Sequence, residues 1–168
     1  MGCLRMKRQT LYLLSGPPGS GKSTWAKGNI HQHETSKYVS RDEIRFAILK
    51  NEDDYFKYEK KVFKKFISEI QKALDDGIDV VYADATHINT QSRMKTLNAL
   101  NIGENVLVIP VYFDTPLRLC LERNKMRSGR ALVPDDVVIR MFNSKTSPID
   151  TDNYDYMGQM SINYWEEK

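Results

Sequence analysis

The sequence has few of the residues that stabilise small secreted proteins or span membranes. Its 168 residues include two cysteines, Cys3 and Cys120, which are too few for a disulfide scaffold or a cysteine-only metal site. No apolar run approaches the ~20 residues that a membrane span needs. The charged N-terminal residues are not followed by the apolar core of a signal peptide. These absences favour a cytoplasmic protein in a reducing compartment, without a membrane partner.

A strong excess of one charge is also missing. The chain has 25 Lys and Arg against 22 Asp and Glu, a net charge of +3, so any basic binding surface has to be local. There are no internal repeats, no low-complexity tracts and no linker rich in proline or serine. We therefore expect a single domain over residues 1–168, with residues 1–9 as an N-terminal tail.

Short apolar runs alternate with helical patterns along the chain. The sequence predicts strands at 10–14, 37–39, 78–82 and 106–113, and an edge strand between 147 and 168. It predicts helices at 21–30, 41–49, 55–74, 90–100, 117–123 and 134–142. This alternation is typical of an α/β domain with a parallel sheet of four to five strands and helices on both faces.

A glycine-rich loop follows the first predicted strand. Residues 16–23 match the pattern G-x-x-x-x-G-K-[ST] at every fixed position. In such a loop glycines let backbone N–H groups face phosphate oxygens, and the next helix adds its positive end. Lys22 would reach the β- and γ-phosphates, and Ser23 would bind Mg²⁺. The predicted site for a nucleoside triphosphate consists of Gly16, Pro17, Pro18, Gly19, Ser20, Gly21, Lys22, Ser23 and Thr24.

Two common classes of P-loop protein do not fit the sequence. A GTP switch carries Asn-Lys-x-Asp, and the nearest string, at 124–127, lacks the aspartate. A motor ATPase usually pairs the aspartate on its magnesium side with a glutamate, but Asp84 is followed by Ala85 and Thr86. The remaining class is a small ATP-dependent kinase, which needs an acceptor site, a base and a basic lid.

The second predicted helix begins with residues suited to an acceptor site. Ser40 and Glu43 fit a capping box, which puts Asp42 in the first turn, where the helix dipole favours an ionised carboxylate. That carboxylate could deprotonate an attacking hydroxyl. Arg45, three residues on, could hold an anionic acceptor. The spacing alone fits an ordinary surface ion pair equally well.

A basic segment at about 115–133 is predicted to form a lid. Between Arg118 and Arg130 there are five basic residues and one acid, and the basic residues are Arg118, Arg123, Lys125, Arg127 and Arg130. Guanidiniums closing over a triphosphate would neutralise charge on the transferring group, and Gly129 would act as the hinge. The alternative is a solvated loop.

The third predicted strand ends at Asp84, on the edge of the sheet where ligands bind in α/β folds. Asp84 would order Mg²⁺ or hold an arginine, and Thr86 is expected on the same edge. We expect His87 at the wall of the acceptor site or at the surface. Aromatic side chains such as Tyr38, Phe46 and Tyr55 could stack on a base, although such residues are more often part of a core.

Taken together, these motifs resemble the kinase domain of the phage 5′-hydroxyl polynucleotide kinases. The resemblance covers about residues 9–145 and rests on segments 16–26, 40–45, 84–86, 123–127 and 133–134. The P-loop is shared by many kinases. The Asp-x-x-Arg after the second strand and the Arg-Asn-x-x-Arg with its downstream Val-Pro are more particular to this family.

The resemblance implies a P-loop kinase that uses ATP and Mg²⁺. It would transfer the γ-phosphate of ATP to the 5′-hydroxyl of a DNA or RNA end. By motif, Asp42 would be the general base and Arg45 would bind the phosphate on the 3′ side of the acceptor. A phage-encoded protein of this kind would work in the host cytoplasm. We find no D-x-D-x-[TV] signature and expect no phosphatase activity.

The resemblance also implies roles on the donor side. Lys22 would be catalytic and would bind the ATP phosphates, while Ser23 would handle Mg²⁺. Arg127 would contact the donor phosphates from the lid, with Arg123 in support. Asp84 would belong to the acceptor or metal edge of the site.

Two other functions stay open from the sequence. One is a small-molecule P-loop kinase whose acceptor is a nucleoside, sugar or drug hydroxyl. The other is a nucleotide-binding interaction protein with little turnover. Arg45 discriminates against the first, because a neutral sugar offers no phosphate for it to bind. Asp42 discriminates against the second, because a binding module has no use for a base.

Overall fold

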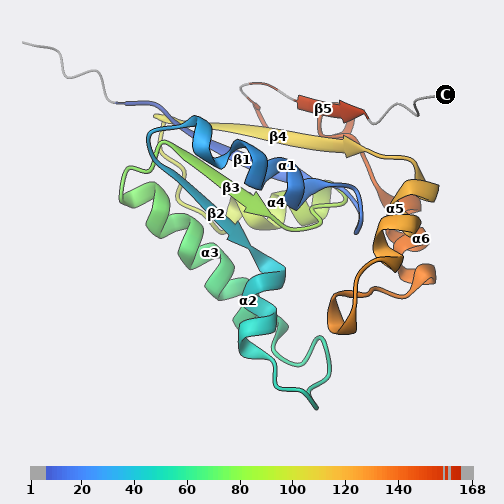
Figure 1. Ribbon diagram of the computed structural model, residues 1–168. Coiled ribbons are helices and arrows are strands. Elements are labelled where there is room, and N and C mark those ends of the chain that lie inside the picture. The colour runs from blue at the N-terminus through green and yellow to red at the C-terminus, as the bar shows by residue number, and fades with distance from the viewer. Residues whose placement is uncertain (1–6, 157, 159, 164–168) are drawn as a thin grey trace, which may run out of the picture.

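A five-stranded parallel sheet forms the centre of the computed structural model, which describes residues 7–156, 158 and 160–163 (Figure 1). Its strands are β1 (Gln9–Ser15), β2 (Ser36–Ser40), β3 (Val80–Asp84), β4 (Val106–Asp114) and β5 (Met160–Asn163). The strand order is β2-β3-β1-β4-β5, and every pairing is parallel. The predicted α/β fold with a parallel sheet is confirmed, including the edge strand near the C-terminal end.

Helices connect the strands, as a parallel sheet requires. They are α1 (Lys22–Asn29), α2 (Arg41–Ile48), α3 (Glu59–Asp75), α4 (Thr90–Asn98), α5 (Leu117–Lys125), α6 (Asp135–Ser144) and α7 (Pro148–Thr151), with 3₁₀ turns η1 (Ile30–Gln32) and η2 (Gly129–Ala131). Among the described residues, no helix combines the length and the apolar content that crossing a membrane would take.

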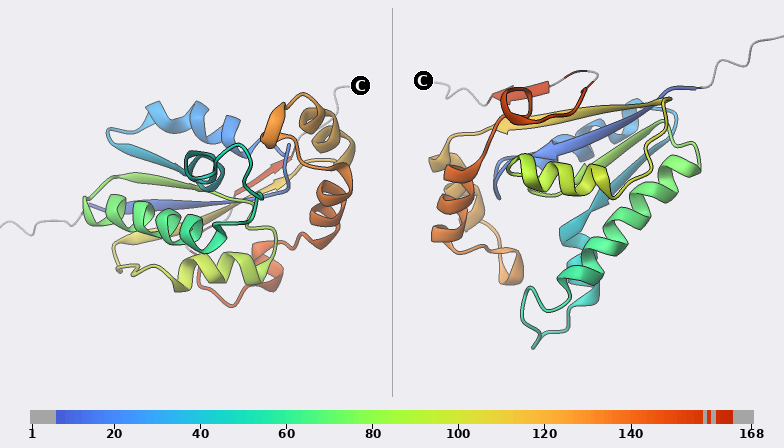
Figure 2. Two further views of the ribbon diagram at one scale, coloured as in Figure 1. Left: turned by 90° about the horizontal axis from the view of Figure 1, so that it is seen from below. Right: turned by 180° about the vertical axis from the view of Figure 1, so that it is seen from behind.

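The two faces of the sheet are covered by different helices (Figures 1 and 2). Helix α1 packs on one face, where Trp25 meets Tyr12, Tyr82 and Phe113 at ring-centroid distances of 5.5, 5.9 and 6.0 Å. Helices α3 and α4 cover the other face. The apolar side chains of α3 recur at helical spacing and are buried there, among them Val62, Phe66 and Ile70. Each such side chain contributes roughly 1.5–3 kcal/mol by leaving water.

The largest difference from the predicted elements is at the start of α3. The sequence pattern predicts a helix from residue 55, but the helix begins at Glu59. Residues 55–58 are held in turns instead, because the Asp54 carboxylate accepts the Phe56 N–H at 2.9 Å and the Asp54 carbonyl accepts the Lys57 N–H at 3.1 Å. Helix α5 begins at Leu117 with Pro116 as its N-cap, and the short helix α7 is not predicted.

The strand register decides where the loops meet. Asp84, the last residue of β3, lies opposite Leu14 of β1 on one side and Ser40 of β2 on the other. The P-loop, the start of α2 and Asp84 therefore share the carboxyl edge of the sheet. This edge is where ligands bind in open α/β folds.

Candidate active site

A cleft of about 470 Å³ opens at this edge of the sheet. Its walls come from the P-loop, the start of α2, the end of β3, the lid and α6. The sequence-predicted residues that line it are Pro18, Lys22, Ser23, Asp42, Arg45, Asp84, Thr86 and Arg127. The residues predicted for nucleotide binding, for the acceptor site and for the lid therefore line the same cleft.

The P-loop is fixed by two glycines with positive φ. Gly19 has φ 78° and Gly21 has φ 97°, conformations that L side chains rarely adopt. A Cβ on Gly19 would lie 2.3 Å from the carbonyl oxygen of Cys120, so only glycine lets the loop lie against α5. The Thr115 hydroxyl donates to the Ser20 carbonyl at 2.8 Å and ties the loop to the end of β4.

Lys22 folds over its own loop. Its Nζ donates to the carbonyls of Gly16 and Pro17 at 2.9 and 3.0 Å, and the residue is buried. Burial lowers the pKa of Lys22 because a charged amine loses its hydration there. Phosphate oxygens would be stronger, charge-assisted partners than these carbonyls. The loop and its lysine therefore fit a triphosphate.

Asp84 is the acidic corner of the cleft. The Ser23 hydroxyl donates to Asp84 Oδ2 at 2.6 Å, and the Tyr38 hydroxyl donates to the same oxygen. Burial and the Asp84 charge raise the pKa of Tyr38, which therefore stays protonated. In nucleotide sites Mg²⁺ takes one or two protein oxygens and completes its shell with phosphate and water, so Ser23 and Asp84 fit it. Tyr38 lies at this corner and not on a stacking surface.

The start of α2 is capped as predicted, but only in part. The Ser40 hydroxyl accepts the Glu43 N–H at 3.2 Å. The Glu43 carboxylate does not complete the capping box, because it pairs with Lys27 of α1 at 3.0 Å. The cap sets the first turn, and this turn directs Asp42 to the cleft.

Arg45 and Asp42 are in contact but differ in burial. The Arg45 side chain is 7% exposed and that of Asp42 is 59% exposed. Arg45 also donates to Glu59 of α3 at 3.0 and 3.2 Å and to the Tyr55 hydroxyl at 3.1 Å. Tyr55 in turn donates to Asp42 at 3.3 Å. The pair is thus an anchored guanidinium with an accessible carboxylate, and not a solvated surface pair.

The two ends of the lid are joined by the buried side chain of Asn124. The Asn124 amide donates to the Val133 carbonyl at 2.6 Å and accepts the Val133 N–H at 3.1 Å. This amide joins the end of α5 to the segment that leads into α6. The structural role of the asparagine in the Arg-Asn-x-x-Arg motif is therefore to hold the backbone of residue 133.

The lid arginines lie in different places. Arg127 is exposed and lines the cleft. Arg123 is not among the lining residues, and it donates to the Gly19 carbonyl at 3.5 Å, behind the P-loop. Arg130 bridges the lid to the loop before α3 through the carbonyls of Asn51 and Asp53, the latter at 3.0 Å. Arg118 pairs with Glu122 at 2.7 Å, outside the cleft lining.

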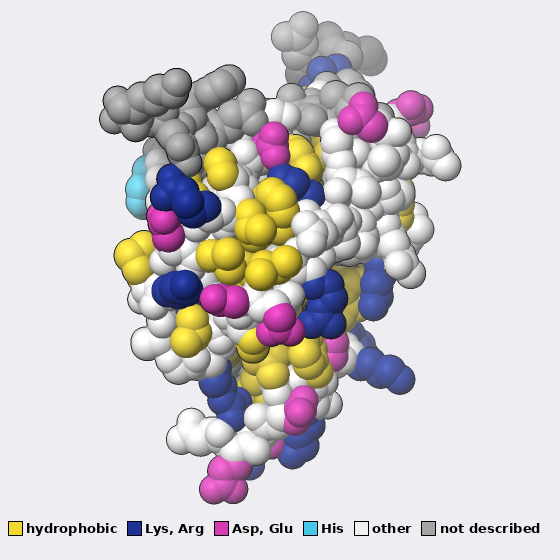
Figure 3. Space-filling model, turned by 90° about the vertical axis from the view of Figure 1, so that its right-hand side faces the viewer, with side chains coloured by type: hydrophobic (Ala, Val, Ile, Leu, Met, Phe, Trp, Pro, Cys, Tyr) yellow, Lys and Arg dark blue, Asp and Glu magenta, His cyan; other side chains and the backbone are white. Residues whose placement is uncertain are grey.

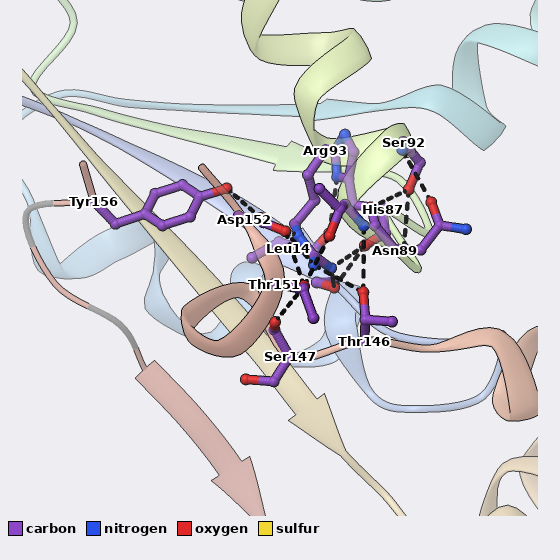
Figure 4. A network of polar contacts seen from close by, with 12 residues as sticks. Leu14, His87, Asn89, Ser92, Arg93, Thr146, Ser147, Thr151, Asp152 and Tyr156 are labelled. Carbon is purple, nitrogen blue, oxygen red and sulfur yellow. Dashed lines mark hydrogen bonds and ion pairs between the residues drawn. The ribbon is translucent and has the colours of Figure 1, made fainter. Parts of the chain in front are cut away.

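His87 is neither a cleft wall nor a surface residue, so that expectation is wrong. It is 2% exposed, and its Nδ1 lies 2.9 Å from the Leu14 carbonyl (Figure 4). Its Nε2 lies 2.9 Å from the Thr96 hydroxyl. A carbonyl only accepts, so Nδ1 carries the proton and Nε2 accepts from Thr96. Burial lowers the pKa of His87 to about 3. The imidazole is therefore neutral and structural.

Arg93 joins this buried network to the C-terminal segment (Figure 4). It donates to Asp152 through Nε at 2.6 Å and through a terminal nitrogen at 2.8 Å. Its other donors go to the His87 carbonyl at 3.0 Å, and to the hydroxyls of Ser15 and Thr146, each at 3.2 Å. Burial raises the pKa of Asp152, but hydrogen bonds, chiefly from Arg93, lower it more, to about 2.

Arg41, Asp53 and Phe56 of the cleft lining have no role predicted from the sequence, and Arg41 pairs with Glu59. Glu59 carried a weak signal, because it is the only acid among the lysines of residues 57–65. An isolated acid at the start of a lysine-rich helix indicates an ion pair, but the pattern does not name the partner. Thr24, predicted to bind ATP, is exposed and not part of the cleft lining.

The loop, strand order and cleft define a P-loop nucleotide-binding domain with the fold of the P-loop kinases. Residues 11–148 match a family described as an AAA domain, and the chain belongs to that family. The matched residues include the P-loop, α2, β3, the lid and α6.

Solved structures share this fold. A chain of the Pnkp1/Rnl/Hen1 RNA repair complex is 23% identical with a TM-score of 0.71, over 84% of this chain and 45% of that chain. A fungal RNA kinase is 13% identical with a TM-score of 0.67, over 95% of this chain and 76% of that one. A sugar kinase from Janibacter sp. HTCC2649 is 13% identical with a TM-score of 0.57, over 93% and 85%. The chain thus spans less than half of the matched RNA-repair chain.

Proposed function

We propose that the protein is an ATP- and Mg²⁺-dependent kinase that phosphorylates the 5′-hydroxyl of a polynucleotide or oligonucleotide end. The observation that carries this proposal is the contact between Asp42 and Arg45 in the cleft that Lys22 also lines. An exposed carboxylate next to an anchored guanidinium suits an acceptor with a hydroxyl beside a phosphate. The fold likeness to an RNA kinase is consistent with this acceptor.

In the proposed reaction Asp42 accepts the proton of the 5′-hydroxyl as its oxygen attacks the γ-phosphorus. The bond from the γ-phosphorus to the β–γ bridging oxygen breaks, and ADP leaves. Phosphoryl transfer has a loose transition state, so positioning and charge neutralisation matter more than a strong base. Lys22 and Arg127 would stabilise the charge on the donor phosphates.

Mg²⁺, when bound, would neutralise charge on the β- and γ-phosphates. The residues that would hold it are Ser23 and Asp84, whose oxygens lie 2.6 Å apart. On the acceptor side, Arg45 would bind the phosphate that follows the first nucleotide. Thr86, on the cleft wall, would contact the acceptor.

The decisive experiment is the transfer of labelled γ-phosphate from ATP. Acceptors are 5′-hydroxyl DNA and RNA oligonucleotides, nucleoside 3′-monophosphates, nucleosides and sugars. We expect label on the oligonucleotides and on the nucleoside 3′-monophosphates. Label on a nucleoside or sugar alone would reject the proposal in favour of a small-molecule kinase. Tight ATP binding with no transfer to any acceptor would indicate a binding module.

The base assignment has its own test within this experiment. Asp42→Asn should leave ATP binding nearly intact and lower transfer by about 10² to 10⁴-fold, the range of a lost general base. Glu43→Gln is the matched control, because Glu43 is the next residue and pairs at the surface with Lys27. Transfer by Asp42→Asn at the rate of the control would reject the assignment.

A further inference from the structure

Two aromatic side chains, Tyr55 and Phe56, line the cleft with Asp42, and a third, Phe46, contacts Tyr55. Phe46 lies on α2, and Tyr55 and Phe56 lie on the turn before α3; we call them the aromatic ledge. The Tyr55 ring meets those of Phe46 and Phe56 edge-on, at centroid distances of 6.3 and 4.9 Å. Phe56 is 63% exposed although it lines the cleft. A large apolar ring in this position is available to a ligand.

The ledge is held in place by hydrogen bonds from both directions. The Phe56 N–H donates to the Asp54 carboxylate at 2.9 Å, and the Phe56 carbonyl accepts the Glu59 N–H at 3.1 Å. Arg130 of the lid donates to the Asp53 carbonyl at 3.0 Å. The exposed ring is therefore carried by an ordered backbone. A preorganised ring loses little entropy when a ligand binds to it.

Tyr55 is not available for stacking in the same way. The Arg45 guanidinium lies 4.7 Å from its ring centroid and covers one face. Its hydroxyl contacts Asp42 and Arg45, so the side chain is used to position these two residues. Phe56, the next residue, contacts the Tyr55 ring with its own ring. Its side chain has no polar atom with which it could position Asp42 or Arg45.

This inference rests on the proposed function. Given that function, the positions of Asp42, Arg45 and Phe56 determine where each part of an acceptor strand would lie. The 5′-hydroxyl would lie at Asp42 and the phosphate after the first nucleotide at Arg45. Tyr55 contacts both Arg45 and Phe56, so the ledge continues outward from that phosphate. We propose that Phe56 is the stacking platform for the base of the second nucleotide of the acceptor.

The chemistry of both walls suits a base. On the lid side the apolar Leu132 is 45% exposed and lines the same cleft. On the face that bears α5 and α6, hydrophobic side chains gather between basic and acidic ones (Figure 3). Base stacking on an aromatic ring contributes ~1–3 kcal/mol and tolerates any sequence. The platform therefore adds affinity for acceptors of two or more nucleotides without reading their sequence.

The test compares three acceptors in steady-state kinetics. They are a nucleoside 3′-monophosphate, a 5′-hydroxyl trinucleotide, and the same trinucleotide without a base at its second position. Phe56→Ala should raise the KM for the intact trinucleotide by about tenfold, with kcat unchanged. It should leave the KM for the mononucleotide unchanged. Removal of the second base should raise the KM of the wild type equally and have no further effect on Phe56→Ala.

Two further variants support this test. Phe56→Trp retains an aromatic ring and should keep the wild-type KM. Ile139→Ala is the matched control, because Ile139 is 38% exposed on α6 and does not line the cleft. An unchanged trinucleotide KM in Phe56→Ala, or an equal rise for the mononucleotide, would overturn the platform while the kinase stands. Absence of transfer to every nucleotide acceptor would overturn the proposed function, and the platform with it.

Discussion

The Arg45 guanidinium and the Glu59 carboxylate are joined by two hydrogen bonds of 3.0 and 3.2 Å, which connect α2 to α3. Glu59 also contacts Arg41, so one carboxylate holds two guanidiniums. Burial raises the pKa of Glu59, but the hydrogen bond from Arg45 and the charges of both arginines lower it more. The carboxylate therefore stays ionised and fixes the direction in which Arg45 points.

Neutralising Glu59 should loosen this arrangement without touching the nucleotide side. Glu59→Gln keeps the shape but loses the charge-assisted pair, so Arg45 is no longer held in one orientation. We expect kcat/KM for a nucleoside 3′-monophosphate to fall by about 10 to 100-fold, and KM for ATP to stay unchanged. Glu69→Gln on the same helix is the control, since Glu69 pairs with Lys65 at 3.5 Å. Equal kinetics in both variants would refute the role of Glu59.

Arg123, in the last turn of α5, and Arg127, just beyond this helix, should differ in their effect on transfer. Arg127 lines the cleft, whereas Arg123 contacts the back of the P-loop at Gly19. Arg127→Ala should lower kcat by about 10³-fold or more if its guanidinium stabilises the transferring group. Arg123→Ala should have a smaller effect, seen mainly in ATP affinity. Single-turnover transfer with saturating ATP separates the two, and a larger loss of kcat in Arg123→Ala would reverse the assignment.

Asp84 should set the Mg²⁺ requirement. In Asp84→Asn the amide oxygen can still accept from Ser23 and Tyr38, but the negative charge is gone. We expect the Mg²⁺ concentration for half-maximal transfer to rise by about 10-fold or more. Tyr38→Phe removes one hydrogen bond and keeps the charge, so its Mg²⁺ dependence should stay close to that of the wild type. The assignment fails if a Mg²⁺ titration of Asp84→Asn superimposes on that of Tyr38→Phe.

His87 should make stability depend on pH. Its pKa of about 3 in the folded state lies below its ordinary value of 6.5, because burial disfavours the imidazolium. Between these values the unfolded chain binds one more proton than the folded one. The stability that comes from keeping His87 neutral is therefore fully present above about pH 6.5. As the pH falls toward 3, the free energy of unfolding decreases by up to about 1.4 kcal/mol per pH unit.

Replacing His87 should remove this component of the pH dependence. Asparagine is the appropriate substitute, because His87 has φ 39° and asparagine tolerates the left-handed region. His87→Asn should be less stable at pH 7 but should lose less stability than the wild type between pH 7 and 5. Urea unfolding at several pH values gives the comparison. Parallel pH profiles for the two proteins would show that His87 does not titrate on unfolding.

The parts of the site that the sequence predicts well are local. The P-loop lies between a strand and a helix, and Asp42 and Arg45 are three positions apart on one helix, so their proximity follows from helix geometry. The alternation of apolar runs and helical patterns likewise predicts a parallel sheet, because parallel strands need crossover helices. These features depend on short stretches of chain that carry their own signals.

The parts that the sequence does not predict depend on contacts between distant segments. Tyr38 and Asp84 are 46 positions apart, and Arg93 and Asp152 are 59 positions apart. A tyrosine or an arginine does not indicate by itself which carboxylate it will meet. His87 shows the same limit, since its position after a strand end predicts an exposed edge. The close approach of β1 and α4 instead surrounds it.

Asn124 has a consequence for how this protein can change over time. The Asn124 amide makes hydrogen bonds to both the N–H and the carbonyl of Val133. Residues 125–132 therefore form a loop whose two ends are held together by these bonds. Insertions or deletions in this loop would not move α5 or α6. The length of this loop can therefore change at positions other than Arg127 and Arg130, which line the cleft. Such changes would alter the cleft wall around Leu132 while the P-loop remained as it was.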